Sequence, residues 1–68
     1  MPNLEAINEV RDELAAIQAQ IDRARAHLHS NRHMLDEAQS RLFEKGLDER
    51  QATLDQTKAK LNAHFPKQ

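Results

Sequence analysis

Residues 4–42 have the sequence LEAINEVRDELAAIQAQIDRARAHLHSNRHMLDEAQSRL, and this stretch decides the fold of the chain. Its apolar residues recur at alternating steps of three and four, which is the spacing of the inner positions of a coiled-coil heptad. These residues are Ile7, Val10, Leu14, Ile17, Ile21, Ala24, Leu28, Leu35, Ala38 and Leu42, with Asn31 as the polar exception among them. The pattern predicts a long amphipathic helix that lies against other helices.

The composition fits one small helical domain. The chain has 68 residues, no Cys, Trp or Tyr, a single Gly and a net charge of −1. The absence of Cys excludes disulfides and zinc–thiolate sites, and a net charge close to zero argues against nucleic acid or an anionic membrane as the main partner. Because no apolar run is long enough to span a membrane and no leader-like segment opens the chain, we expect a soluble cytoplasmic protein.

Gly46 is the strongest local signal for a turn. A left-handed Gly46 would close one helix, with Leu47 packing on Leu42 as in a Schellman ending. Asp48 would then cap a second helix, with Gln51 completing a capping box. The fold expected from this pattern is an all-α antiparallel helical hairpin in one domain, residues 1–68. Helix one would span about 3–45, the turn 46–47, and helix two about 48–64.

A break near Ser30 is the alternative. His29, Ser30 and Asn31 form a cluster of polar residues with poor helix propensity, and Ser30 could cap a new helix. The chain would then fold as a three-helix bundle. The heptads continue through this cluster, so the hairpin with a long coiled-coil-like first helix is the favoured prediction.

The unequal helix lengths expected in this hairpin point to a partner. A second helix of about sixteen residues would cover only the C-terminal part of the first. The apolar residues left without an intrachain partner are predicted to bind another chain, and they are Leu4, Ile7, Val10, Leu14, Ile17, Ile21 and Leu28. Parallel pairing of two copies would create no ion pairs at the flanking heptad positions. An antiparallel homodimer, or a different helical protein with acidic flanks, is therefore favoured.

Catalytic and metal-binding chemistry is not indicated. His29 and His33 are four residues apart, the spacing of a two-histidine metal pair, but they fall on the outer face of the predicted helix and no carboxylate completes a site. With the turn at Gly46, His64 would lie level with His29. We expect solvent-exposed histidines, no metal, no cofactor and no catalytic residues. Three arginines could touch RNA, but no aromatic side chains accompany them; they are Arg23, Arg25 and Arg32.

The run Leu42–Gln51, followed by Leu54 and Leu61, resembles the small helical-hairpin co-chaperones of type III secretion. In that family a two-helix protein pairs with a larger helical-repeat chaperone, and together they keep the needle subunit unpolymerised in the bacterial cytoplasm. The resemblance implies a non-enzymatic chaperone or assembly adaptor that binds its partner through residues such as Leu14, Ile17 and Ile21. The alternative is a structural coiled-coil homo-oligomer, and a nucleic-acid-binding protein is the third hypothesis.

Overall fold

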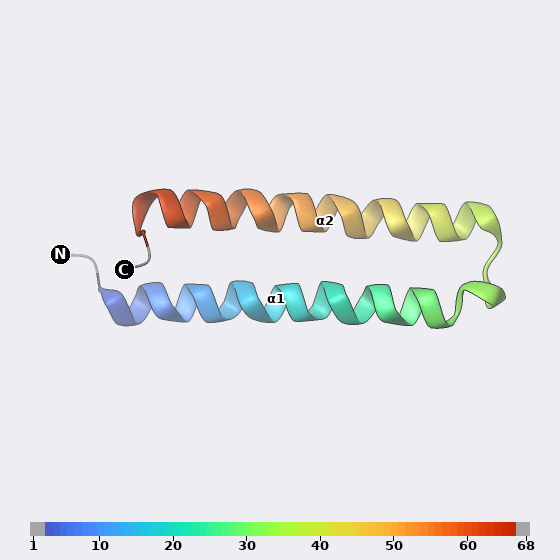
Figure 1. Ribbon diagram of the computed structural model, residues 1–68, viewed down its shortest axis with the longest axis horizontal. Coiled ribbons are helices and arrows are strands. Elements are labelled where there is room, and N and C mark those ends of the chain that lie inside the picture. Colours follow the sequence, from blue (N-terminus) through green and yellow to red (C-terminus); the bar gives the residue numbers. More distant parts are fainter. Residues whose placement is uncertain (1–2, 67–68) are drawn as a thin grey trace.

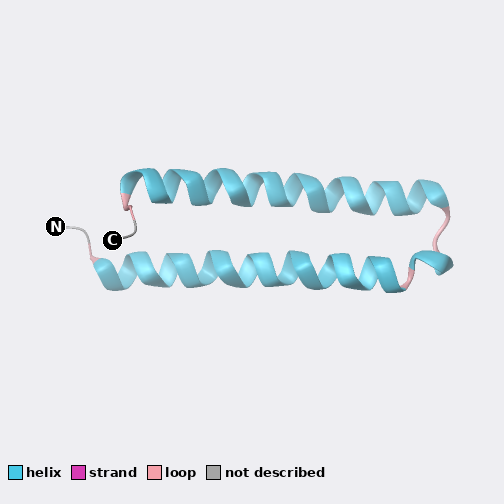
Figure 2. Ribbon diagram, viewed as in Figure 1, coloured by secondary structure: helices cyan, strands magenta, loops and turns pink. Residues whose placement is uncertain are grey.

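The computed structural model describes residues 3–66 and shows an all-α helical hairpin (Figures 1 and 2). Helix α1 spans Leu4–Ser30, a short 3₁₀ turn η1 spans Arg32–Met34, and helix α2 spans Glu37–His64. The two long helices have 27 and 28 residues and run antiparallel side by side in a rod of 52 × 16 × 15 Å. The predicted all-α hairpin is therefore confirmed.

Asparagines cap both ends of α1. The Asn3 side chain accepts hydrogen bonds from the backbone N–H groups of Glu5 and Ala6, at 3.0 and 3.3 Å. At the other end, Asn31 donates to the His27 carbonyl through its backbone N–H, at 3.0 Å, and through its side-chain amide, at 2.8 Å. Each cap satisfies backbone groups that a helix end leaves unpaired. Asn31 thus ends the helix instead of occupying an inner heptad position of a longer one.

A complete capping box starts α2. The Asp36 carboxylate accepts from the Gln39 backbone N–H at 2.7 Å, and the Gln39 side chain accepts from the Asp36 backbone N–H at 3.2 Å. Between the two helices, η1 tightens the chain and Leu35 is extended. The hairpin therefore turns over residues 31–36.

The predicted turn at Gly46 and Leu47 is wrong. Helix α2 runs through Gly46, Leu47 and Asp48, and Gly46 does not have a positive φ angle. A glycine inside a helix costs only about 1 kcal/mol, which is less than the packing that two helices of equal length gain along their whole contact. The break expected in the three-helix alternative does lie near Ser30, but the chain after it forms one helix and not two.

The seam between the helices alternates apolar and polar layers. Leu14, Ile21 and Leu54 are buried, and Leu61 packs against them. Between these layers, polar residues that lie four positions after the inner apolar residues of α1 reach across the seam to the second half of the hairpin. Their contacts join Arg11 to the Phe65 carbonyl, Gln18 to Gln51, Arg25 to Asp48 and Arg32 to Glu44.

The Gln18–Gln51 pair lies near the middle of this seam. Each amide donates to the carbonyl oxygen of the other, at 2.8 and 2.7 Å, and each also donates to the aspartate four residues further along its own helix. Shifting α2 by one heptad would place Glu44 or Lys58 opposite Gln18 and break this mutual pairing. The glutamine pair therefore helps to fix the alignment of the two helices.

Gly46→Ala tests the position of the turn. Alanine favours the helix over glycine, and nothing lies within 4 Å of the Cβ that the substitution adds. We expect the free energy of unfolding to rise by about 0.5–1 kcal/mol, measured by urea denaturation with circular dichroism. The reverse exchange at an exposed site of the same helix, Ala52→Gly, should cost a similar amount. A less stable Gly46→Ala protein would contradict a helix at this position.

A double-mutant cycle tests the glutamine pair. Gln18→Ala and Gln51→Ala each remove both reciprocal bonds, so each should lower the free energy of unfolding by about 1 kcal/mol. The double variant should cost less than the sum, with a coupling of about 0.5–1.5 kcal/mol, measured by urea denaturation. Gln56→Ala, at an exposed position of α2, is the control and should change little. Additive effects would mean that the two amides do not act as a pair.

Candidate functional site

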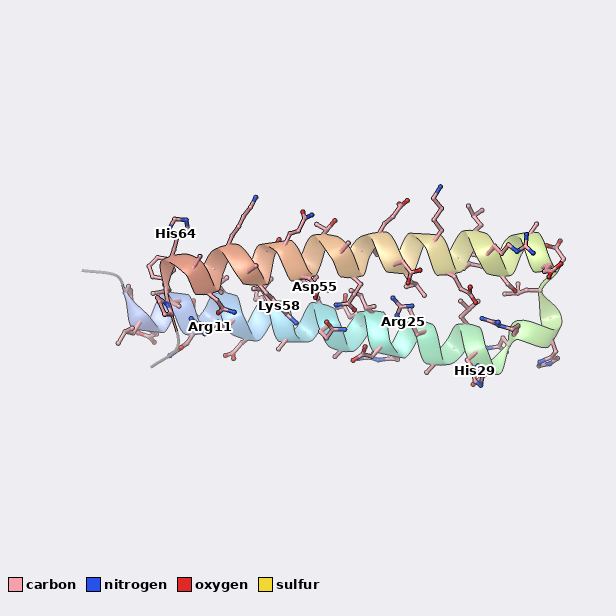
Figure 3. The ribbon with its side chains drawn as sticks, turned by 45° about the horizontal axis from the view of Figure 1, so that its top comes forward. Arg11, Arg25, His29, Asp55, Lys58 and His64 are labelled. Atoms are coloured by element: carbon pink, nitrogen blue, oxygen red, sulfur yellow. The ribbon has the colours of Figure 1, made fainter. Side chains whose placement is uncertain are left out.

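One side of the hairpin carries charged residues that bond to partners within the chain. Arg25 forms an ion pair with Asp48 at 2.9 Å, and Lys58 lies 3.4 Å from the Gln18 side-chain oxygen (Figure 3). Asp22 and Asp55 accept hydrogen bonds from the central glutamines, at 3.0 and 2.9 Å. This charged side is occupied by interactions within the chain, so it offers little unsatisfied chemistry to a partner.

The opposite side carries apolar residues in the open. Val10 and Ile17 on α1 are 46% and 42% exposed. Ala24 continues the same line, because residues seven apart return to nearly the same side of a helix. We call these three residues the side stripe. Single exposed apolar residues are common on protein surfaces, but an aligned row marks a surface suited to binding another protein.

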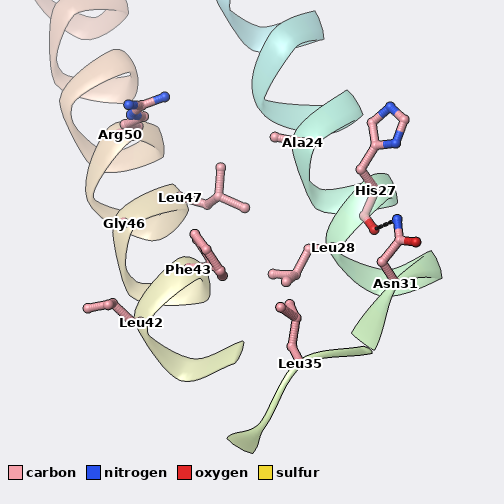
Figure 4. A pocket seen from close by; sticks show the side chains of 10 residues that line it. All are labelled: Ala24, His27, Leu28, Asn31, Leu35, Leu42, Phe43, Gly46, Leu47 and Arg50. Carbon is pink, nitrogen blue, oxygen red and sulfur yellow. Dashed lines mark hydrogen bonds between the residues drawn. The ribbon is translucent and has the colours of Figure 1, made fainter. Parts of the chain in front are cut away.

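The side stripe leads into a groove at the turn end of the hairpin (Figure 4). The groove has a volume of about 440 Å³ and opens between α1 and α2. Its apolar lining consists of Ala24, Leu28, Leu35, Leu42, Phe43 and Leu47. In Figure 4, Leu28, Leu35, Phe43 and Leu47 point into the space between the helices, whereas Leu42 points away from α1. We call this feature the turn-end groove.

Two of the predicted partner-binding residues lie in the core of the hairpin. Leu14 is buried, and Ile21 is only 4% exposed, in a cluster with Leu54. Ile7 and Leu28 are half-buried. The prediction that these residues lack an intrachain partner is wrong. Helix α2 is as long as α1, so it also covers the apolar residues in the N-terminal half of α1.

The other predicted residues separate into two groups. Val10 and Ile17 stay exposed and form the side stripe with Ala24. Leu4 is 71% exposed, but it lies one heptad before Arg11, on the line of residues that face the charged side. The surface left for a partner is therefore narrower than the sequence alone suggested.

The heptad pattern did not reveal the contribution of α2 to this surface. Phe43 is 52% exposed and belongs to the turn-end groove, and Met34 is exposed at the turn itself. The place of Phe43 in this surface was not predicted, because a turn at Gly46 would put this residue in the last turn of helix one. The signal that could have revealed it is the spacing of Asp36 and Gln39, the same capping pattern that was assigned to Asp48 and Gln51.

The three predicted turn residues have other places in the structure. Gly46 and Leu47 line the turn-end groove, and Asp48 pairs with Arg25 on the charged side. The expectation that His64 lies level with His29 also fails. His29 is in the last turn of α1 and His64 in the last turn of α2, so the two lie at opposite ends of the hairpin (Figure 3).

The surface of the described residues carries apolar side chains that can pack against a partner and charged side chains that form ion pairs. Within residues 3–66, no group of three or more His, Asp or Glu side chains is arranged to hold a metal ion. Neither of the long helices, over the same residues, contains an apolar stretch sufficient to cross a membrane. No protein-family model, curated protein or solved structure matches the chain.

Proposed function

We propose that this protein is a non-enzymatic protein-interaction module, which buries its side stripe and turn-end groove against another helical chain. The observation that carries the proposal is the continuity of these two apolar features along one side of a thin hairpin. The core supports it, because Leu14, Ile21 and Leu54 are the buried apolar residues of the described chain. So small a core gives little stability on its own.

The exposed area of the chain supports the same proposal. The hairpin exposes 5745 Å². A folded monomer of 7.8 kDa is expected to expose about 4,400 Å². The excess of roughly 1,300 Å² is larger than the area that each partner of a standard-size complex buries, which is about 800 Å². Association with another chain would bring the exposed area into the normal range.

A small chaperone or assembly adaptor in the bacterial cytoplasm is the specific form we propose. Its support is the length of the chain and the hairpin shape, which are similar to those of type III secretion co-chaperones. The run Leu42–Gln51, which suggested that resemblance, lies inside α2 and not at a turn. A structural homo-oligomer is the second candidate, because the same apolar side can be covered by another copy.

Nucleic acid is a weaker candidate for the partner. Arg25 and Arg32, two of the three arginines that suggested it, are engaged with Asp48 and Glu44. Their charges are thus partly neutralised within the chain, and a phosphate backbone is bound mainly by free positive charge.

Photo-crosslinking in the cells that make the protein tests the proposal. A photoreactive amino acid at Ile17 should give an adduct heavier than the single chain, because this position lies on the surface proposed to contact a partner. The same amino acid at Ala19, at nearly the same level of α1 but turned away from Ile17, is the control and should give little adduct. Equal adducts at both positions, or none at Ile17, would contradict the proposal.

A further inference from the structure

We infer that the chain covering the side stripe is a second copy of this protein, with its α1 antiparallel to the first α1 about a two-fold axis level with Ile17. The inference rests on the proposed function and names the partner. Two hairpins placed in this way meet along their α1 helices. Each α1 then packs on α2 within its own chain and on α1 of the other copy.

Because the side stripe of α1 is apolar, the side stripe of another α1 is its favoured neighbour. On α2, the line of residues on the same side of the hairpin as the side stripe starts at Phe43. It continues at seven-residue steps through Arg50 and Thr57, so it is mainly polar. Packing the side stripe on that line would bury polar groups against apolar ones, which is costly. Packing it on a second side stripe buries apolar groups against apolar groups.

The two-fold arrangement also matches side-chain sizes. With the axis level with Ile17, the two Ile17 side chains meet each other. Val10 of each copy then lies level with Ala24 of the other, since both positions are seven residues from the axis. A larger side chain thus faces a smaller one, which lets the layers interdigitate.

The charges of α1 favour the antiparallel orientation. Glu9 and Glu13 in its first half and Arg23 in its second half lie beyond the side stripe, on the side that faces away from α2, and none of the three is in an ion pair within residues 3–66. In a parallel pair, each glutamate would face the same glutamate of the other copy. In the antiparallel pair, Arg23 lies level with residue 11 of the other copy, between its Glu9 and Glu13. Opposite charges beside such a contact favour one orientation over the other.

The elongated hairpin has exposed area to spare for a dimer interface. If each copy buries its excess of roughly 1,300 Å², the dimer buries about 2,600 Å² in total. That value lies in the range of obligate homodimer interfaces, about 2,000–5,000 Å². The contact would extend along α1, which is about 40 Å long.

Cysteine crosslinking tests the position of the axis. The chain has no cysteine, so each introduced thiol is unique. Purified Ile17→Cys protein should form a disulfide-linked dimer on mild oxidation, whereas Ala19→Cys should not. A mixture of Val10→Cys and Ala24→Cys chains should form the mixed disulfide in preference to either symmetric one. Predominant crosslinking of Ala19→Cys, or no crosslinking of Ile17→Cys, would overturn the inference.

A charge exchange at Ile17 tests the same contact without a covalent bond. The parent protein should sediment as a dimer at micromolar concentration. Ile17→Glu and Ile17→Arg should each weaken the dimer by about 100-fold or more, because like charges meet at the axis. Mixing the two variants should restore a dimer that contains one chain of each. Ala19→Glu is the control and should leave the dimer intact.

The outcomes separate this inference from the proposed function. A monomeric parent protein overturns the inference. If the Ile17 photo-adduct in cells then has the mass of a different partner, the interaction module stands and the second copy does not. If the parent is monomeric and Ile17 gives no adduct, both proposals fail.

Discussion

The capping box at Asp36 fixes where this hairpin turns, and the rest of the structure depends on that position. A helix that begins at Glu37 has 28 residues, which nearly equals the 27 of α1. Equal lengths allow each apolar layer of α1, from Ile7 to Leu28, to meet a layer of α2. A turn ten residues later would leave the N-terminal half of α1 without a partner and would shorten the contact that stabilises both helices.

The fold class could be predicted from the sequence, but the turn could not. Helix-forming composition and heptad spacing are properties of whole segments, and they establish an all-α hairpin. The turn depends on a competition between two local signals, Gly46 and the Asp36–Gln39 pair. Glycine is the stronger signal locally, yet its cost inside a helix is small compared with the packing of a full-length seam. A turn at Asp36 is favoured only when the packing of the whole hairpin that turns there is compared with the packing of the whole hairpin that turns at Gly46.

Only part of the candidate site could be predicted from the sequence. Heptad spacing identified Val10, Ile17, Leu14 and Ile21 together, but it does not say which line of apolar residues meets the other helix of the same chain. In the structure, α2 packs on the line of Leu14 and Ile21 and on the polar line of Gln18 and Arg25 beside it. Val10 and Ile17 are left on the outside. The polar residues that complete the seam have ordinary surface composition, so periodicity of hydrophobicity alone could not reveal them.

The turn at the middle of the chain brings the start of α1 and the end of α2 to the same end of the rod (Figure 1), while the turn-end groove opens at the other end. Within one chain, the described ends therefore lie far from that chain's own groove. In the antiparallel dimer, the same ends would lie beside the turn-end groove of the other copy. An insertion that must act next to the groove of its own chain belongs in the loop around Met34, which is exposed at that end.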